Sequence, residues 1–272
     1  MLPFVHVPSV ELGPVAIHPF GVLVATAVWV GTSLATWRAR VLGVDAQQLR
    51  SFVGWMLVAG FIGGHVIDLL LYSPRDVIAD PSSLLFLWRS QGSFGGFMGA
   101  MLGVLWWKHK THEPILPYAD LVLSVFPVAW IFGRAGCALA HDHPGIPVDA
   151  GTPLAVAYGR YDASAATIFP LGIELRWGNE PRWDLGALEM FFAMLVAGCF
   201  AATWHKRLPL GAYVAATCVA YAPVRFAMEF LRVADARYSS LTPAQWACFP
   251  LFLFGLWLAR ELRGRTRPSF TS

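Results

Sequence analysis

Residues 119–145 read ADLVLSVFPVAWIFGRAGCALAHDHPG. The part up to residue 140 is almost entirely apolar, and a helix needs about 20 such residues to cross a bilayer. This stretch therefore predicts a membrane-spanning helix. Arg134 lies near the end of the run, and two histidines and an aspartate follow it. Because a charge at the centre of a membrane costs about 2.5–3.5 kcal/mol on insertion scales, such a residue usually serves a function.

The composition of the whole chain supports a membrane protein. Of 272 residues, 56% are hydrophobic and 14% are charged, and the mean hydropathy is +0.54, whereas soluble proteins carry about 25% charged residues. The net charge is only +3, and no basic run suits a nucleic-acid surface, so no nucleic-acid partner is expected. The four cysteines lie within or beside apolar segments, which argues against a disulfide framework, and no paired CxxC spacing indicates zinc. They are Cys137, Cys199, Cys218 and Cys248.

Seven apolar segments are predicted to span the bilayer as helices. Their approximate ranges are 17–37, 52–72, 93–107, 119–140, 185–204, 210–231 and 244–261. The fold class is therefore an all-α polytopic membrane protein, with residues 1–272 forming a single integral membrane domain. The long loop 141–184 is predicted to form a small extracytoplasmic head, in which TIFPLGIELRW (167–177) supplies a strand.

The basic residues predict the orientation of these segments. Eleven of the twenty fall on one side of the predicted bundle, which the positive-inside rule assigns to the cytoplasm. The N-terminus is then outside, and the C-terminus is cytoplasmic. The eleven are Arg38, Arg40, Arg50, Lys108, Lys110, Lys206, Arg207, Arg260, Arg263, Arg265 and Arg267.

Other titratable residues fall in the same outer half of the predicted bundle. Arg225, Glu229 and Arg232 share one helix face, where Glu229 could serve only as an ion-pair clasp. Glu189, near the start of its segment, could serve as a cap or an ion-pair partner there. Charges at one level of a bundle usually meet in a pocket. Arg134 has no acid three or four residues away, so a distant acid or an anionic ligand is expected beside it.

The glycines around Arg134 favour a lipid ligand. Gly133 and Gly136 allow a backbone or a lipid to approach closely, because glycine has no side chain. The planar fork of arginine suits phosphate. The residues alone thus predict a protein embedded in the bilayer with an arginine-rich site for an anionic phospholipid headgroup.

Two motifs resemble those of the prolipoprotein diacylglyceryl transferases. The family's G-R-x-G-N-F-x-N-x-E-x-x-G is similar to residues 133–145, and its R-F-x-x-E-F-x-R-x-x-D is similar to residues 225–235. Residues 92–100, GSFGGFMGA, resemble the segment around the family's S-F-H-G-G, and Glu189 falls where the family has the glutamate of H-P-x-Q-x-Y-E. The matching positions are Gly95, Gly96, Gly133, Arg134, Gly136, Gly145, Arg225, Phe226, Glu229, Phe230, Arg232 and Asp235, with Asp142 in place of a glutamate.

The resemblance implies an activity in the bacterial cytoplasmic (inner) membrane. The family transfers the diacylglyceryl group of phosphatidylglycerol to the lipobox cysteine of a lipoprotein precursor peptide and releases glycerol phosphate, without a cofactor. It implies that Arg134 and Arg225 hold the phosphate and stabilise the transition state, and that Glu229, with Arg232, orients Arg225. It also implies a substrate-binding role for Glu229 and Arg232 and for six further matched positions, namely Gly95, Gly96, Gly133, Gly136, Gly145 and Glu189.

The chain departs from the family pattern where proton transfer is expected. The histidine of S-F-H-G-G is Phe94, and the asparagine after G-R-x-G is Cys137. His141 or His143 could replace the lost base, with Asp142 as its orienter, because an imidazole titrates near neutral pH. The alternative is a polar turn that only ends the helix before Pro144 and Gly145.

Other functions stay open on the sequence alone. One is a transferase of the same fold with a different acceptor or phospholipid, and another is a non-catalytic lipid-binding protein. A hydrolase with metal at 141–143 is disfavoured, because neighbouring residues of an extended chain point apart and no helical ligand spacing is present, so no metal is expected. Burial disfavours Cys137 as a nucleophile.

Overall fold

The structure, a computed structural model, describes residues 1–12, 15–87, 91–162, 166–206, 208–233 and 237–265. Three residues used above, Arg207, Asp235 and Arg267, lie outside these ranges. The protein is mostly helical, at 67%. Among the described residues, four helical stretches are long and apolar enough to cross a membrane. They are α1 (Pro19–Leu42), α2 (Ala46–Tyr72), α5 (Ile115–Ala140) and Ala212–Leu231, which comprises α7 (Ala212–Met228) and η4 (Glu229–Leu231).

The three other predicted segments also fold as helices. They are α4 (Ser93–Thr111), α6 (Leu185–Ala201) and α8 (Pro243–Arg265). Helix α6 is apolar but only 17 residues long. The mostly helical fold class is thus confirmed, whereas the number of seven bilayer crossings stays a prediction.

The chain divides into two compact units. Unit 1 comprises Met1–Ser33, Val125–His205 and Phe230–Val233, and unit 2 comprises Leu34–Ser124, Lys206–Glu229 and Ala234–Ser272. Helices α1 and α5 each belong to both units, with one end in unit 1 and the other end in unit 2. The prediction of a single membrane domain concerns both units together and stays a prediction.

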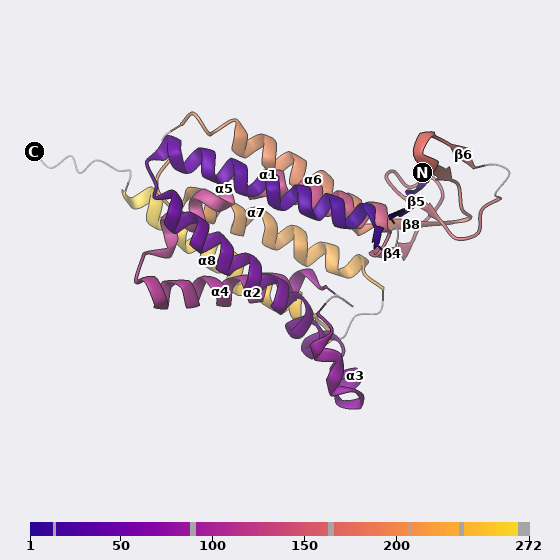
Figure 1. The fold of residues 1–272 in the computed structure, drawn as a ribbon, viewed down its shortest axis with the longest axis horizontal. Helices are drawn as coiled ribbons and strands as arrows, with labels where there is room; N and C mark the ends of the chain where they lie inside the picture. The colour runs from indigo at the N-terminus through magenta and orange to yellow at the C-terminus, as the bar shows by residue number, and fades with distance from the viewer. Residues whose placement is uncertain (13–14, 88–90, 163–165, 207, 234–236, 266–272) are drawn as a thin grey trace, which may run out of the picture. The chain divides into compact units, whose positions relative to one another are not determined.

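In unit 2, glycines bring α2 and α4 into close contact, and the two helices run side by side in Figure 1. A Cβ atom added to Gly63 would lie 2.6 Å from the Cα atom of Gly99, and one added to Gly103 would lie 2.5 Å from the carbonyl oxygen of Trp55. Small residues at such spacing let two backbones approach within the membrane. Along the chain, α3 (Pro74–Ala79) and η1 (Pro81–Leu85) follow α2 and precede α4.

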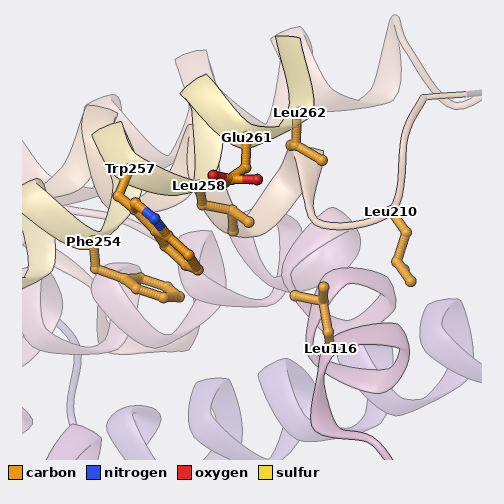
Figure 2. Close-up of a pocket in the computed structure, with 7 residues that line it drawn as sticks. All are labelled: Leu116, Leu210, Phe254, Trp257, Leu258, Glu261 and Leu262. Carbon is orange, nitrogen blue, oxygen red and sulfur yellow. The ribbon is translucent and has the colours of Figure 1, made fainter. Parts of the chain in front are cut away.

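The rest of unit 2 is built on α7 and α8. Asp120 of α5 accepts a hydrogen bond from the backbone N–H of Val214 (3.0 Å), near the start of α7. Thr242 and Gln245 form a reciprocal cap at the start of α8. A cavity of about 200 Å³, shown in Figure 2, is lined by Leu116, Leu210, Phe254, Trp257, Leu258, Glu261 and Leu262. This apolar cavity contains none of the predicted site residues.

The described residues of unit 1 form three small antiparallel sheets. One has the order β4 (Pro144–Pro147), β8 (Glu180–Asp184), β5 (Val156–Tyr158). The second has the order β1 (Phe4–His6), β7 (Glu174–Arg176), β6 (Thr167–Ile168), with η3 (Pro170–Gly172) between β6 and β7. The third pairs β2 (Val10–Leu12) with β3 (Val15–Ile17). The strand predicted within 167–177 is confirmed, and the pairing of the N-terminal residues with it was not predicted.

These strands join the end of α5 to the start of α6. Helix α5 ends at Ala140, and His141 adopts a left-handed conformation (φ 50°) that turns the chain into β4. Strand β4 pairs with β8, which runs directly into α6. A Cβ atom on Gly186 would lie 2.7 Å from the backbone nitrogen of Ala138, so the two helices touch at this end. Arg134 and Glu189 both lie beside this junction.

Candidate functional site

Arg134 is buried in unit 1 and forms an ion pair with Glu189. The guanidinium Nε contacts Glu189 Oε2, and the two side chains are 5% and 2% exposed. Arg134 lies on α5 and Glu189 lies on α6, and both helices are apolar. Of the two partners expected for Arg134, a distant acid or an anionic ligand, the distant acid is present, and the ligand stays a prediction. In such a buried pair, the attraction between the two charges offsets part of the free energy that each charge loses when it leaves water.

Two further contacts fix the guanidinium. Its Cζ atom lies 4.5 Å from the centre of the Trp130 ring, one turn earlier on α5, which is a cation–π distance. Its Nη1 lies 3.9 Å from the sulfur of Cys137. In the part of the chain that the structure describes, its Nη2 has no hydrogen-bonding partner although it is buried. Arg134 is thus held in place with one nitrogen left to donate to a ligand.

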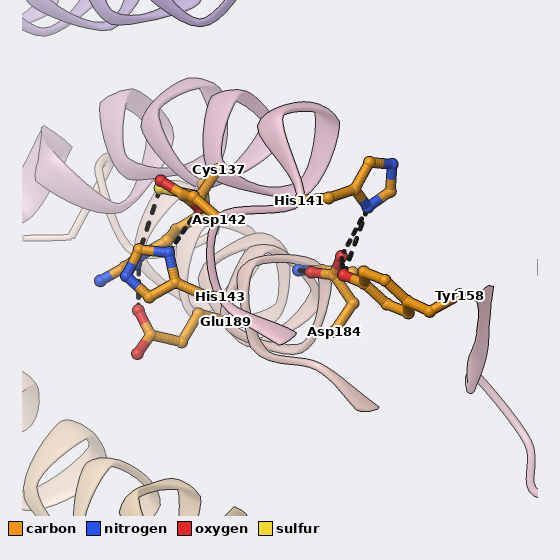
Figure 3. A network of polar contacts seen from close by, with 9 residues as sticks. Cys137, His141, Asp142, His143, Tyr158, Asp184 and Glu189 are labelled. Atoms are coloured by element: carbon orange, nitrogen blue, oxygen red, sulfur yellow. Dashed lines mark hydrogen bonds and ion pairs between the residues drawn. The ribbon is translucent and has the colours of Figure 1, made fainter. Parts of the chain in front are cut away.

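His141 belongs to a different polar network, at the other side of the α5–β4 turn. Figure 3 shows its ring directed toward Asp184 and Tyr158, away from Asp142 and His143. Its Nδ1 lies 3.1 Å from Asp184 Oδ2, and its Nε2 lies 3.0 Å from the carbonyl oxygen of Val5. The ring also stacks on Phe4 at a centroid distance of 3.7 Å. Both ring nitrogens therefore face oxygen acceptors.

Asp184 is the centre of that network. It accepts a hydrogen bond from the Tyr158 hydroxyl (2.8 Å) and another from the backbone N–H of Ala187 (2.9 Å), which makes it the N-cap of α6. Burial of Tyr158, and then the negative charge of Asp184, raise the pKa of the Tyr158 phenol above its ordinary value of 10. Tyr158 therefore stays protonated and donates. This network ties β5 and the end of α5 to the start of α6.

Asp142 and His143 form a separate contact with each other. His143 Nδ1 is paired with Asp142 Oδ1, and Cys137 lies close to both. Figure 3 shows these three residues gathered above Glu189. His143 is 19% exposed and Asp142 is 41% exposed, whereas the His141 side chain is only 8% exposed. Of the two predicted histidines, His143 is the one that Asp142 can orient.

Unit 2 holds a second buried arginine–glutamate pair. Arg225 Nη2 lies 2.8 Å from Glu229 Oε2, one helical turn later, with the side chains 9% and 0% exposed. The carbonyl oxygen of Phe226, on the same turn, accepts a hydrogen bond from Gln245 Nε2 of α8 (3.3 Å). The ion pair expected from the sequence spacing is present. Because this pair and the Arg134 pair belong to different units, their meeting in one pocket stays a prediction.

The sequence profile of the prolipoprotein diacylglyceryl transferase family matches residues 8–260 of this chain. The protein belongs to this family. Curated relatives called phosphatidylglycerol–prolipoprotein diacylglyceryl transferase come from several bacteria. The chain is 26% identical to that of Pseudomonas putida over 285 residues, covering 99% of this chain and 100% of the relative. It is 28% identical to that of Nitratidesulfovibrio vulgaris over 267 residues, covering 94% and 93%. The resemblance inferred from the motifs, and the transferase class, are confirmed.

The predicted glycines of this diacylglyceryl transferase family member mostly serve close packing. A Cβ atom on Gly136 would lie 3.1 Å from the Phe20 ring of α1, and one on Gly145 would lie 2.9 Å from the Cβ atom of Trp183. A Cβ atom on Gly95 would clash with the carbonyl oxygen of Gly63 on α2, whereas one on Gly96 would lie 3.7 Å from that of Gly60. A Cβ atom on Gly133 would meet nothing within 4 Å. Their predicted substrate-binding roles stay predictions.

Two of the remaining motif residues meet in unit 1. Arg232 forms an isolated antiparallel bridge with Gly145, so the ends of the two family motifs touch through their backbones. A Cβ atom on Gly145 would also lie 3.0 Å from the carbonyl oxygen of Leu231. Glycine at this family position therefore permits the second motif to pack on the first.

Sequence reasoning missed three residues that build the site. Asp184 precedes an apolar helix, and this is an N-cap signal that could have identified it. Trp130 lies four residues before Arg134, a spacing that permits the cation–π contact. Tyr158 carries no local signal, because only the pairing of β5 with β8 brings it to Asp184.

Proposed function

We propose that this protein transfers the diacylglyceryl group of phosphatidylglycerol to the cysteine thiol of a lipoprotein precursor and releases glycerol phosphate. The match of the transferase family to residues 8–260 supports this function, as do the names of relatives that align over almost the whole chain. Within the site, the observation that carries it is the buried Arg134, whose Nε is paired with Glu189 while its Nη2 has no hydrogen-bonding partner among the described residues.

Arg134 is suited to stabilise the leaving phosphate. In the transition state, negative charge grows on the oxygen that departs with glycerol phosphate. A donor already fixed in a dry site stabilises that charge without reorganising, which is the largest effect in many enzymes. Glu189 and Trp130 fix Arg134 before the lipid arrives. Glu189 is thus assigned a positioning role.

Arg225 has the second phosphate-binding role in the proposal. Glu229 is fully buried and paired with it, so the guanidinium is oriented from within its own helix. Arg232, three residues beyond Glu229, is assigned to the same substrate-binding set.

His143 is assigned the proton-transfer role, with Asp142 as its orienter. Asp142 contacts the His143 ring, and the ring is partly exposed, so a substrate thiol could reach it. His141 instead holds the junction of α5 and α6, because both of its ring nitrogens face protein oxygens. Its contribution to catalysis is positional.

The proposed topology follows from the helices and the basic residues. All seven helices α1, α2, α4, α5, α6, α7 and α8 are proposed to cross the bacterial inner membrane. The N-terminus and the head 141–184 lie outside, and the C-terminus lies in the cytoplasm. Arg40 lies in the last turn of α1, and Lys108 and Lys110 lie in the last turn of α4, so these helices end in basic residues. Labelling of single cysteines placed at Asp149 and at Glu261 by an impermeant reagent tests this: only the first should react in intact cells.

The activity is tested with purified protein, phosphatidylglycerol vesicles and a peptide that contains a lipobox cysteine. The expected products are a peptide heavier by one diacylglyceryl group and an equal amount of glycerol phosphate. The same reaction with a peptide in which serine replaces the cysteine is the control. Absence of both products in the wild-type reaction would contradict the function.

A second candidate is a transferase that uses another acceptor or another phospholipid. The specific observation in its favour is that Phe94 and Cys137 replace polar family residues. Release of glycerol phosphate without lipidated peptide would support this candidate, and vesicles of other anionic phospholipids would then identify the lipid donor.

A further inference from the structure

Three potential metal ligands converge where α5 ends. The ligand atoms of Cys137, Asp142 and His143 all lie within 4.8 Å of one another. Cys137 comes from the last turn of α5, and the other two come from the turn that follows it. The set thus offers one sulfur, one carboxylate oxygen and one imidazole nitrogen.

We propose that Cys137, Asp142 and His143 bind a zinc ion whose fourth position receives the thiol of the acceptor cysteine. Zinc prefers sulfur, nitrogen and carboxylate ligands, and catalytic zinc sites have three protein ligands and an open fourth position. Ligand atoms around tetrahedral zinc lie roughly 3.5 Å apart. Side-chain adjustments of about 1 Å therefore suffice to close the site. The acceptor role rests on the proposed function.

The backbone explains why the sequence did not predict this site. Neighbouring residues point apart on an extended chain, and on that ground metal binding at 141–143 was disfavoured. However, His141 has a φ of 50°, in the left-handed region, so the chain turns back at the helix end. Asp142 and His143 consequently lie close to Cys137, whereas His141 is directed to Asp184 (Figure 3).

The charges around the site are compatible with a divalent cation. A thiolate and a carboxylate balance the two positive charges of zinc. Arg134 lies nearby, with its Nη1 3.9 Å from the sulfur of Cys137, but its charge is compensated by Glu189. Asp142 is exposed and the other two ligands are partly exposed, so one side of the cluster is open to an acceptor.

In this inference Asp142 and His143 act as zinc ligands in place of the proton-transfer role proposed for them above, and the ion supplies the deprotonation of the acceptor thiol. The acceptor thiol loses its proton to solvent when its sulfur binds the ion, because a coordinated thiol is deprotonated. The sulfur then attacks the terminal glyceryl carbon of the diacylglyceryl group and forms a C–S bond. The C–O bond to phosphate breaks, and its electron pair leaves with glycerol phosphate beside Arg134. This route replaces the base lost at Phe94 and gives a reason for Cys137 and Asp142 at family asparagine and glutamate positions.

Metal binding by the full-length protein in detergent is the first test. Metal-stripped wild type should bind one Co²⁺ or Zn²⁺ per chain, and the cobalt form should show sulfur-to-cobalt charge-transfer absorption. Cys137→Ser should remove that absorption, and His143→Ala and Asp142→Asn should each weaken Co²⁺ binding about tenfold or more. Asp142→Cys retains a ligand, so it should retain binding and strengthen the absorption. The matched controls Cys199→Ser, His205→Ala and Asp149→Asn should behave as wild type.

The outcomes separate this inference from the proposed function. No charge-transfer absorption in the wild type, or the same absorption in Cys137→Ser, would overturn the site. Lipidation of the peptide should stop on metal removal and return with Zn²⁺. Full lipidation by metal-free protein would overturn the zinc inference and leave the proposed function intact. Metal binding through all three residues without lipidated peptide would support the site and overturn its acceptor role.

Discussion

The two buried arginine–glutamate pairs are built in different ways. Arg225 and Glu229 lie one turn apart on a single helical stretch of unit 2. Arg134 and Glu189 lie on two helices of unit 1, and strands β4 to β8 separate them in sequence. The first pair can form as soon as its helix forms. The second requires β4 and β8 to pair and bring α5 and α6 together, so it contributes to the tertiary fold as well as to the site.

This difference predicts distinct consequences of mutation. Removing one partner of a buried pair leaves the other charge without compensation, which costs about 3–5 kcal/mol. For Arg134 and Glu189, that cost acts on the contact between two helices. For Arg225 and Glu229, it acts within one helical stretch, so no contact between two helices depends on this pair. Activity should therefore depend on both pairs, and stability mainly on the first.

The largest expected effect is that of Arg134→Ala on turnover. Loss of the fixed donor should lower the rate of peptide lipidation by about 10²–10³-fold or more, since removing one donor to a developing oxyanion has this effect. Arg134→Lys keeps the charge but lacks the planar fork, so its loss should be intermediate. Mass spectrometry of the peptide measures the rates. The exposed Arg160→Ala is the control, and a near-wild-type rate for Arg134→Ala would refute the phosphate-binding role.

The next largest effect is that of Glu189→Gln on stability. The buried guanidinium of Arg134 loses its countercharge, and we expect the free energy of unfolding to fall by about 3 kcal/mol. Thermal unfolding in detergent measures the shift, with the exposed Glu261→Gln as control. The double variant Arg134→Met with Glu189→Met should regain most of the stability, because it leaves no uncompensated charge, yet it should stay inactive. A stable and active double variant would show that the pair is not needed for the reaction.

Glu229→Gln should alter activity more than stability. Because Arg225 and Glu229 lie on one helical stretch, the substitution weakens no contact between two helices, and the unfolding midpoint should move less than in Glu189→Gln. Because the orientation of Arg225 is weakened, lipidation should slow about tenfold, as for the loss of one charge-assisted hydrogen bond of about 1.5 kcal/mol. Arg50→Gln, exposed on α2, is a control for charge removal in unit 2. A midpoint shift equal to that of Glu189→Gln would contradict the distinction between the two pairs.

The sequence predicted the helices better than the site. All seven predicted segments are helical, because apolar length is a local property of the chain. The Arg225–Glu229 pair was also predicted, because a four-residue spacing is local. The strand within 167–177 was predicted, but its pairing with Phe4–His6 depends on residues far apart in the chain.

Long-range contacts account for what the sequence did not predict. Asp142 was expected to orient either histidine, but the left-handed turn at His141 separates the two rings. His141 is then hydrogen-bonded to Asp184, and Asp142 contacts His143. The left-handed φ at His141 decides this division, and a histidine does not by itself signal it, because only a few per cent of non-glycine residues adopt that region even though histidine is enriched among them.

The smallest expected effect is that of Tyr158→Phe, which tests the network around Asp184 and not the buried charges. Loss of one hydrogen bond to Asp184 should lower the free energy of unfolding by about 1 kcal/mol at neutral pH.

The raised pKa of Tyr158 also predicts a pH dependence. Above pH 10 the unfolded chain releases the phenolic proton while the folded chain retains it, so the stabilisation by Tyr158 is present below pH 10 and declines above it. The difference in unfolding free energy between wild type and Tyr158→Phe should therefore narrow as the pH rises above 10. Tyr161→Phe, on the neighbouring exposed segment, is the matched control. A difference that stays constant with pH would mean that Tyr158 ionises as readily in the folded protein as in the unfolded chain, and that Asp184 secures α6 through His141 and the Ala187 N–H alone.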